Sequence, residues 1–371
     1  MKTRSALLTT QPGKWEVTDV ELDDPRQGEV LVKVAASGLC HSDVHVADGS
    51  QPLPNLPLAG GHEGAGVVVE VGPGTQGYEV GDHVVMSFLP VCGRCRMCAT
   101  GHQNLCDLGA AMFTGSRPDD QESFRITMNG KPVGQMAGIS THSEHTVVDI
   151  RSTVKIDRTI PLDRAALLGC GVATGWGSVT NMADVHPGDV VLVMGVGGVG
   201  INSVQAAVAI GASAVIAVDP VAFKLDNAKR LGATHLATSI TEGANIAREL
   251  TNGQGADAAI VCVGNTDGIH LVEALDAVRK AGTVVATGVG SLIESGAPLN
   301  NTLLTLFQKR LQGALYGGLN PTWDIPNLLT QYTRGKLDLD SLITRTYTLD
   351  QIEDGYRDMM AGENIRGVIA F

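Results

Sequence analysis

Four of the seven cysteines of this chain lie in one short stretch, CGRCRMCATGHQNLC at residues 92–106. They are Cys92, Cys95, Cys98 and Cys106, and short intervals of this kind let four thiolates converge on one tetrahedral Zn²⁺. Four sulfur ligands leave no open position for a substrate, so the spacing predicts a structural zinc. Two alternatives remain, a cluster of ordinary thiols and a zinc module that binds nucleic acid.

Two further cysteines stand in stretches with unusual neighbours, Cys40 in GLCHSDVH and Cys170 in LLGCGVATGW. Between them lie His62 and Glu63 in GGHEGAG. Cys40, His62 and Cys170 could form an open Cys2His site that keeps one position for a substrate. The long intervals between these residues carry no local signature. The alternative is therefore two buried apolar thiols and a turn histidine whose hydrogen bonds are satisfied.

A third pattern is typical of dinucleotide binding. The apolar run at 190–194 is followed by the glycine turn GVGGVG at 195–200, a helical stretch at 201–212, and a second apolar run at 214–219 that ends in an acidic residue. Strand, glycine turn, helix, strand and acid occur here in the order of a Rossmann unit. That order makes the signal much more specific than the glycines alone.

The residues of this pattern have separate roles. Gly195 permits the turn, Gly197 lets the backbone approach a pyrophosphate, and Gly200 brings helix and strand together. Asp219 can accept hydrogen bonds from the ribose 2′-OH of NAD, whereas it would repel the 2′-phosphate of NADP. The sequence therefore predicts NAD as the cofactor.

The elements that must position these residues fall into two kinds. After the glycine turn, apolar runs at 256–264 and 281–290 are typical of buried strands, with the helical stretch IHLVEALDAVRK between them. We therefore expect an α/β fold with a Rossmann-type, doubly wound parallel sheet. Before the turn, short apolar runs at 29–38, 65–72 and 81–88 are broken by Gly, Pro and Asp, which predicts a mostly antiparallel β domain.

Composition limits the partners of the chain. Its 371 residues carry a net charge of -12, and Lys and Arg are scattered, so we expect neither a nucleic-acid surface nor a membrane patch. We find no unbroken run of about 18 apolar residues and no signal peptide. The expectation is a cytoplasmic protein whose partners are small molecules.

Motifs along essentially the whole chain resemble one family, the zinc-dependent medium-chain alcohol dehydrogenases. They are GLCHSD, GGHEGAG, the four-cysteine stretch, GVGGVG and ENIRGVIAF. Within the family, CGRCRMCATGHQNLCDLGA, GCGVATGWGS, GGVGINSVQ and AVDPVAFK are most similar to the nicotinoprotein subgroup. Members of that subgroup hold NAD(H) tightly and are assayed with the artificial acceptor N,N-dimethyl-p-nitrosoaniline (NDMA).

The resemblance implies a particular domain organisation. A GroES-like catalytic domain would span residues 1–171 and carry the zinc lobe at about 92–106. A Rossmann NAD-binding domain would follow at 172–315, and the segment 316–371 would return to the catalytic domain. GALYGG at 313–318 is similar to the edge strand through which family members pair, so a homodimer or homotetramer is implied.

The resemblance also implies roles around the open metal site. Cys40, His62 and Cys170 would hold a catalytic zinc, and Asp43 would hydrogen-bond the ligand histidine and fix its tautomer. Glu63 would be a carboxylate behind the metal, with a solvated turn residue as the alternative.

A proton relay is implied by the same resemblance. It would run from the alcohol through Ser42 and the nicotinamide ribose to His45. A plain surface histidine is the alternative at His45.

Further positions are matched to cofactor and substrate contacts. The implied cofactor contacts are His41, Thr174, Gly195, Gly197, Gly198, Val199, Gly200, Asp219, Lys224, Val289 and Arg366. Lys224 and Arg366 could instead be ordinary solvated charges. Phe88, Ala111 and His142 fall at pocket-lining positions, and His142 departs from the aromatic hydrocarbon common in the family.

Three functions share much of this sequence. The first is a zinc alcohol dehydrogenase with exchangeable NAD, and the second is a nicotinoprotein with retained NAD(H) and an external electron acceptor. The third is a non-enzymatic protein that binds zinc and nucleotide, which Ser42 and His45 beside an intact metal triad disfavour. We therefore expect hydride transfer between an alcohol/aldehyde pair and NAD(H), with two Zn²⁺ per chain, most similar to the nicotinoprotein type.

Overall fold

The computed structural model describes residues 1–293 and 296–371, and the chain divides into two compact units. Unit 1 comprises Met1–Cys170, Asn320–Gly335 and Leu339–Phe371, and unit 2 comprises Gly171–Leu319 and Lys336–Asp338. The chain thus leaves unit 1 directly after Cys170. Most of the segment after Leu319 belongs again to unit 1, apart from three residues that remain with unit 2.

Unit 1 is built around a closed barrel and a seven-stranded sheet. The barrel has the order β1 (Lys2–Leu8), β2 (Trp15–Leu22), β7 (Ile126–Met128), β8 (Lys131–Gln135) and β4 (Leu58–Ala59). The sheet has the order β10 (Thr153–Ile156), β6 (His83–Ser87), β5 (Glu63–Val71), β3 (Glu29–Gly38), β18 (Arg366–Ala370) and β17 (Ile343–Tyr347), and β9 (His145–Asp149) also pairs with β3.

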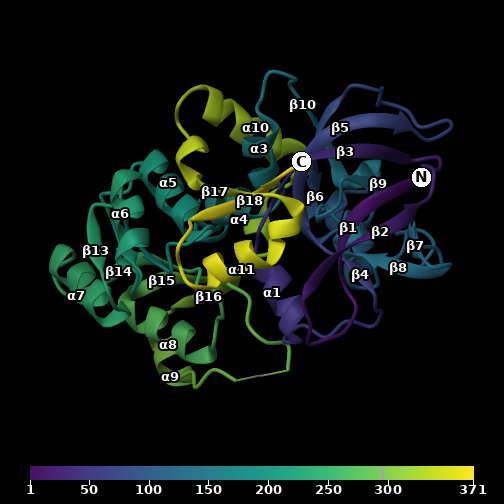
Figure 1. The fold of residues 1–371 in the computed structure, drawn as a ribbon. Coiled ribbons are helices and arrows are strands. Elements are labelled where there is room, and N and C mark those ends of the chain that lie inside the picture. Colours follow the sequence, from purple (N-terminus) through teal and green to yellow (C-terminus); the bar gives the residue numbers. More distant parts are fainter. Residues whose placement is uncertain (294–295) are drawn as a thin grey trace. The chain divides into compact units, whose positions relative to one another are not determined.

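Strand β3 is the centre of this sheet. Its sequence EVLVKVAASG buries nearly every side chain, and the strand pairs antiparallel with β5, β9 and β18. Strand β18, drawn in yellow in Figure 1, joins the sheet between β3 and β17 and pairs parallel with β17. The mostly antiparallel domain predicted for the N-terminal part is confirmed.

Short helices connect the strands of unit 1. The α-helices are α1 (His41–Asp48), α2 (Arg96–Ala99), α3 (Leu162–Ala166), α10 (Pro321–Thr333) and α11 (Ile352–Met360). The 3₁₀ segments are η1 (Gln103–Leu105), η2 (Asp107–Phe113), η3 (Met136–Gly138), η4 (Ile150–Ser152), η5 (Leu167–Gly169), η8 (Asp340–Leu342) and η9 (Leu349–Gln351). The apolar face of α11 packs with Leu39, Tyr347 and Ile369 in one buried cluster.

Unit 2 contains a six-stranded parallel sheet. Its order is β13 (His235–Ala237), β12 (Ala214–Val218), β11 (Val190–Met194), β14 (Ala256–Val261), β15 (Val278–Ala286) and β16 (Arg310–Gly313). Chain order reverses at β11, as in a doubly wound Rossmann sheet. The predicted α/β fold is confirmed.

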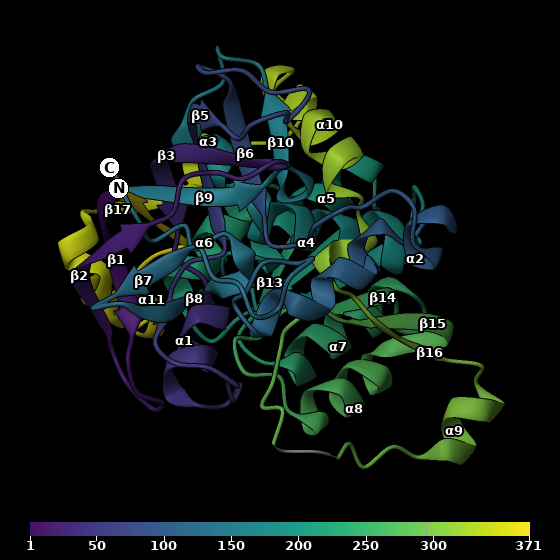
Figure 2. The same cartoon turned by 90° about the vertical axis from the view of Figure 1, so that its right-hand side faces the viewer.

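The helices of unit 2 cover this sheet. They are α4 (Gly171–Gly177), α5 (Gly200–Ile210), α6 (Ala222–Arg230), α7 (Ile240–Leu250), α8 (Gly268–Ala277) and α9 (Asn301–Leu306), with the short segments η6 (Ser178–Met182) and η7 (Tyr316–Gly318). Every residue of β11 is buried, as expected for a parallel strand covered on both faces. Figure 2 shows α7 and α8 side by side.

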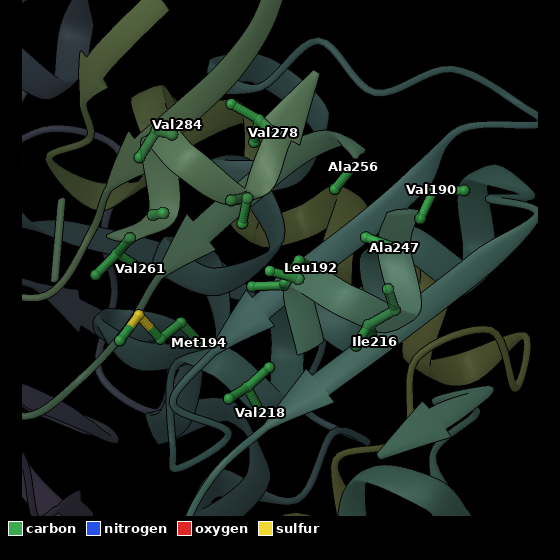
Figure 3. Close-up of a cluster of buried hydrophobic side chains, with 14 of the residues drawn as sticks. Val190, Leu192, Met194, Ile216, Val218, Ala247, Ala256, Val261, Val278 and Val284 are labelled. Carbon is green, nitrogen blue, oxygen red and sulfur yellow. The ribbon is translucent and has the colours of Figure 1, made fainter. Parts of the chain in front are cut away.

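One face of the sheet packs on α7 and α8. Figure 3 shows this cluster, in which Leu192 and Ile216 from neighbouring strands lie close to Ala247 of α7. Ala244 and Ala274 also belong to it. Their small side chains let the helices approach the sheet closely, and the larger buried side chains of the strands, mostly valines, fill the layer between them.

Two boundaries differ from the sequence-based expectation. The helix expected to reach residue 280 ends at Ala277, because β15 already begins at Val278, which pairs with Ala256. The edge strand expected at 313–318 is also wrong in position. Strand β16 ends at Gly313, and a positive φ at Tyr316 and Gly317 turns the chain into η7. In the part of the chain that the structure describes, no helix combines the length and apolarity needed to cross a bilayer.

Candidate functional site

Two groups of side chains among residues 1–293 and 296–371 have the arrangement of a metal site. One group is Cys92, Cys95, Cys98 and Cys106, and the other is Cys40, His62 and Cys170. In each group the possible ligand atoms lie within 4.8 Å of one another. Both groups were predicted from the sequence, and both belong to unit 1.

The four-cysteine group has the dimensions of a tetrahedral zinc site. The Sγ atoms of Cys92 and Cys98 are 3.9 Å apart, and those of Cys95 and Cys106 are 4.0 Å apart. Four sulfurs at about 2.3 Å from one zinc lie roughly 3.8 Å from each other, so these two distances fit a tetrahedral zinc site. The same distances are far too long for disulfides, which have an S–S length of about 2.05 Å.

Backbone amides prepare this loop for a cation. Cys95 caps α2, where its sulfur accepts a hydrogen bond from the amide of Cys98 at 3.4 Å. Hydrogen bonds from the amides of Arg94 and Cys95 lower the pKa of Cys92 to about 6. The loop therefore favours the thiolate at this position, which is the form that binds zinc.

The second group draws its three residues from different elements. Cys40 is the N-cap of α1, His62 directly precedes β5, and Cys170 follows η5 at the end of the first segment of unit 1. Gly61 has a φ of +86, and a Cβ there would meet the backbone nitrogen of His142 at 2.5 Å. Gly61, the residue before His62 in the motif GGHEGAG, is thus required because its backbone has a positive φ and a side chain there would clash with His142.

Asp43 fixes two of these three residues with one carboxylate. Its Oδ1 lies 3.0 Å from Nδ1 of His62, and its Oδ2 accepts a hydrogen bond from the backbone amide of Cys40 at 3.2 Å. The second contact is part of a capping box at the start of α1. When the imidazole of His62 is neutral and its Nδ1 donates to the carboxylate, its Nε2 carries the lone pair. That Nε2 is buried and has no hydrogen-bond partner among the described residues, as a metal ligand requires.

Electrostatics in this group favour cation binding. Burial alone would raise the pKa of Asp43, but the charge of His62 and hydrogen bonds from His142 and His62 hold it well below its usual range. Burial opposes protonation of His62, yet the charge of Asp43 raises the pKa of the imidazole and makes it a stronger ligand. A hydrogen bond from Cys170 lowers the pKa of the Cys40 thiol, so Cys40 ionises first. These residues therefore fit a zinc ion.

Glu63 is fully buried in β5, which excludes the solvated turn residue considered as an alternative. Its carboxylate pairs with Arg366 of β18, whose guanidinium also donates to the carbonyl of Leu39 at 3.3 Å. Arg366 is likewise buried, so it is not an ordinary solvated charge. Its match to a cofactor phosphate contact stays a prediction.

The remaining residues of α1 lie close to Cys40. Ser42 Oγ is 3.8 Å from the sulfur of Cys40, and the rings of His41 and His45 have centroids 5.5 Å apart. His45 is only 4% exposed, which argues against a plain surface histidine. Ser42 and His45 are three residues apart and therefore share one face of the helix. The proton relay stays a prediction.

The three expected pocket residues have different surroundings. Phe88 makes an edge contact with the ring of His62, at a centroid distance of 5.7 Å. Ala111 belongs to η2, and its side chain lies outside the described residues. His142 is fully buried, with Nδ1 at 2.8 Å from Ser37 Oγ and Nε2 at 2.7 Å from Tyr356 Oη. Tyr356 was not predicted, because its spacing in α11 is that of an ordinary core residue.

In unit 2 the glycine turn follows β11 and leads into α5. Gly195 has a φ of +83, and a Cβ there would meet the backbone of Cys262 at 2.9 Å. A Cβ on Gly200 would overlap the carbonyl oxygen of Gly195. A Cβ on Gly197, by contrast, would meet among the described residues only Nζ of Lys224, at 3.9 Å. Gly197 thus borders open space beside an ammonium group, which fits a phosphate.

Asp219 directly follows β12, where its carboxylate accepts hydrogen bonds from the amides of Val196 and Val221 at 3.1 and 3.0 Å. Lys224 Nζ lies 4.0 Å from the same carboxylate. The acid is thereby held beside the glycine turn, where the ribose of NAD would bind.

The other cofactor positions are divided between the units. Gly198 accepts a hydrogen bond from the side chain of Asn202, and Val199 is the N-cap of α5. Thr174 is buried in α4, and Val289 is exposed after β15. His41 and Arg366 belong to unit 1, and the remaining predicted cofactor residues belong to unit 2.

Comparisons with known proteins agree along the whole chain. Residues 26–158 match the family model of the alcohol dehydrogenase GroES-like domain, and residues 198–333 match that of the zinc-binding dehydrogenases. Alcohol dehydrogenase B of Mycobacterium tuberculosis is 46% identical over 371 residues, covering 100% of this chain and 99% of that protein. The NDMA-dependent alcohol dehydrogenase of Amycolatopsis methanolica is 47% identical over 369 residues, with coverage of 100% and 99%.

A solved structure gives the same result for the fold. Benzyl alcohol dehydrogenase from Acinetobacter calcoaceticus superposes with a TM-score of 0.92 at 30% sequence identity. The match covers 100% of this chain and 99% of that chain. The similarity therefore includes both units and the segments that connect them.

Proposed function

The chain belongs to the zinc-dependent medium-chain alcohol dehydrogenases, and we propose that it keeps its NAD(H) between turnovers and passes electrons from an alcohol to an external acceptor. As a member of this family it is an NAD(H)-dependent oxidoreductase that acts on small alcohols or aldehydes and binds two zinc ions. Retention of the cofactor between turnovers is a proposal that goes beyond membership of the family. It is supported by the 47% identity to an NDMA-dependent relative over the full chain.

One observation carries the assignment of the reaction centre. Cys40, His62 and Cys170 bring three ligand atoms together, and the buried Nε2 of His62 is aimed by the Asp43 hydrogen bond on its other nitrogen. Three protein ligands leave one position for a substrate, whereas the four-cysteine group does not. When bound, zinc supplies Lewis acidity toward an alcohol oxygen and NAD⁺ supplies a hydride acceptor. We assign the first group to catalysis and the second to structure.

The side chains of α1 handle the proton. We assign Ser42 as the group that takes the proton of the alcohol, because its hydroxyl lies beside Cys40 on the first turn of α1. His45 follows on the same helix face and passes the proton onward. Asp43 keeps His62 in one tautomer throughout the reaction. Glu63, the residue after His62, forms an ion pair with Arg366 that carries no net charge.

Most of the predicted cofactor contacts belong to unit 2. Gly197 and Lys224 face the pyrophosphate, α5 presents its N-terminus, and Asp219 accepts the ribose hydroxyls. We assign Phe88, whose ring contacts His62, to the substrate pocket, together with Ala111 and His142 as the further pocket positions that the family resemblance implies. The chemical class of the substrate is a small alcohol or its aldehyde.

The test measures metal and nucleotide on freshly purified, desalted protein. We expect about two zinc ions and, after heat denaturation, about one released nucleotide per chain. The same sample should reduce NDMA with an alcohol and without added NAD. Nucleotide-free protein that turns over steadily on added NAD would show a conventional dehydrogenase, and full activity with one zinc would overturn the metal assignment.

We also propose that the chain pairs with itself through unit 2. Strand β16 is an edge strand whose four residues are all exposed, and Leu306 and Leu315, which flank it in the sequence, are exposed as well. An edge of this kind is a template for strand pairing with a second copy. Light scattering at micromolar concentration should give the mass of a dimer or tetramer, and a monomer would contradict the proposal.

A further inference from the structure

Behind the candidate metal site, Asp43 is the meeting point of a buried hydrogen-bond network. One oxygen faces His62, and the other, which accepts from the amide of Cys40, also lies 3.8 Å from Nε2 of His142. That nitrogen is 2.7 Å from the hydroxyl of Tyr356, whose pKa is raised by burial and by the nearby negative charge of Asp43. Tyr356 comes from α11, far along the chain, and is buried with the others.

The network continues on the other side of His142. Its Nδ1 lies 2.8 Å from Ser37 Oγ, which is 2.7 Å from Thr141 Oγ1. Both hydroxyls are within donating distance of the carbonyl of Glu63, at 3.1 and 3.2 Å. Ser37, Thr141 and His142 are all fully buried, so these contacts are not shared with bulk water.

One arrangement of protons in this network supplies Asp43 with a donor. Thr141 donates to the Glu63 carbonyl, and Ser37 donates to Nδ1 of His142. Nε2 of His142 then carries the hydrogen and donates to the oxygen of Tyr356. The hydroxyl proton of Tyr356 is thereby left for Asp43. In this arrangement the network directs a donor onto the carboxylate that holds His62.

We propose that Tyr356 and His142 are positioning residues for the metal ligand His62, acting through Asp43. This inference rests on the proposed assignment of Cys40, His62 and Cys170 to the catalytic zinc. One oxygen of the Asp43 carboxylate faces His62, and the other accepts from the amide of Cys40. Both contacts depend on the rotation of this carboxylate, which Tyr356 fixes. Groups that orient a metal ligand in this way tune metal retention as well as the chemistry at the metal.

A neighbouring tyrosine provides a matched control. Tyr347 lies in the same buried cluster as Tyr356, and its hydroxyl donates to Asp358 at 2.8 Å. Tyr347→Phe and Tyr356→Phe therefore remove the same atom from the same core. Among the described contacts of Asp43, none involves Tyr347. A general loss of core stability would affect both variants, whereas a positioning role affects only the second.

The experiment measures zinc release from the holoenzyme to a chelator. Alkylation of the freed thiols and mass spectrometry separate loss at Cys40 and Cys170 from loss at the four-cysteine group. We expect Tyr356→Phe to speed loss of the Cys40–Cys170 zinc about 3- to 10-fold, somewhat less than removal of a direct partner of a ligand. Release from the four-cysteine group should be unchanged, and Tyr347→Phe should match the wild type at both sites.

A double-mutant cycle tests the direction of the network. His142→Phe keeps an aromatic ring but removes both nitrogens, so it should also speed zinc loss. In protein that already carries Tyr356→Phe, the added His142→Phe change should speed zinc loss little further, because the connection from His142 through Tyr356 to Asp43 is already broken. If each change only disturbed packing independently, their effects on the rate of zinc loss would be additive.

The outcomes separate this inference from the proposed function. If wild-type protein holds zinc only at the four-cysteine group, the proposed function fails. If wild-type protein holds both ions but Tyr356→Phe releases them like Tyr347→Phe, or the two changes are additive, the positioning role is overturned.

Discussion

Arg366 donates a hydrogen bond to the carboxylate of Glu63, a residue 303 positions earlier in the chain, and both side chains are buried. The pair joins the start of β5, directly after His62 in the sequence, to the start of β18. A charge buried this deeply depends on its partner, because water cannot replace the lost contact. The stability of unit 1 and the surroundings of the metal site are therefore linked through one ion pair.

Removing one partner should destabilise the protein strongly. We expect Arg366→Met to lower the free energy of unfolding by about 3–5 kcal/mol, since it leaves the Glu63 carboxylate buried and unpaired. Changing both residues, as Glu63→Gln with Arg366→Met, should recover part of that loss. Urea denaturation of the zinc-loaded protein measures it. An Arg366→Met variant as stable as the wild type would show that Glu63 finds another partner.

The two metal groups should fail differently when a ligand is lost. Cys95→Ser should remove one zinc and lower thermal stability, because metal-binding free energy is folding free energy for such a loop. Its folded fraction should still oxidise alcohol. Cys170→Ser should abolish activity while the fold persists. Zinc analysis, circular dichroism and activity per folded molecule measure these effects. A thermally normal but inactive Cys95→Ser would reverse the assignment.

Asp219 should set the choice between NAD and NADP. Asp219→Asn keeps one acceptor oxygen but removes the negative charge, so binding of NADP⁺ should improve relative to NAD⁺ by about 10-fold or more. Isothermal titration on nucleotide-stripped protein measures both dissociation constants. Asp219→Ala should in addition weaken NAD⁺ itself, because the ribose loses its acceptor. Wild-type protein that binds both cofactors equally would contradict this role.

A buried cluster away from the metal site should make unfolding pH-dependent. Burial would raise the pKa of Glu29, but the charge of Arg125 and hydrogen bonds from Arg26, Arg125 and Arg117 lower it from 4.5. Because the folded pKa is below the unfolded one, this contribution is complete above pH 4.5 and is lost as pH falls through the lower folded value.

Glu29→Gln removes this titration while keeping the shape of the side chain. The variant should be less stable than the wild type at pH 7, and the difference should shrink as pH falls below 4.5. The urea concentrations at the unfolding midpoint, measured at several pH values, give this difference in stability. Because both proteins lose metal at low pH, comparing them cancels that effect. A difference that stays constant with pH would mean that the Glu29 charge contributes nothing.

The parts that were predicted from the sequence are those with local patterns. Strand β11, the glycine turn and Asp219 lie within one βαβ unit, and the four cysteines lie within one loop. In the βαβ unit and in the four-cysteine loop, the functional residues are close in the sequence. The local backbone conformation therefore fixes their relative positions. The assignment of Cys40, His62 and Cys170 depended on family resemblance, because their convergence is a tertiary property.

The parts that were not predicted are contacts between distant elements. Tyr356 follows the apolar period of α11, which indicates only that it is buried. Nothing in that period shows that its hydroxyl meets His142, or that His142 faces inward. Arg366 was matched to a phosphate contact by its motif, while its pairing with Glu63 depends on the place of β18 in the sheet. Such pairs follow from topology rather than from spacing.

The place of β18 between β3 and β17 also orders events during synthesis. Strands β3, β5 and β6 leave the ribosome early, but the sheet of unit 1 has a missing strand until Arg366–Ala370 has been made. Gly171–Leu319, which supplies nearly all of unit 2, is complete before then. We therefore expect nascent chains to acquire a protease-resistant nucleotide-binding unit while the metal-binding unit is still open and its cysteines are still accessible to alkylation.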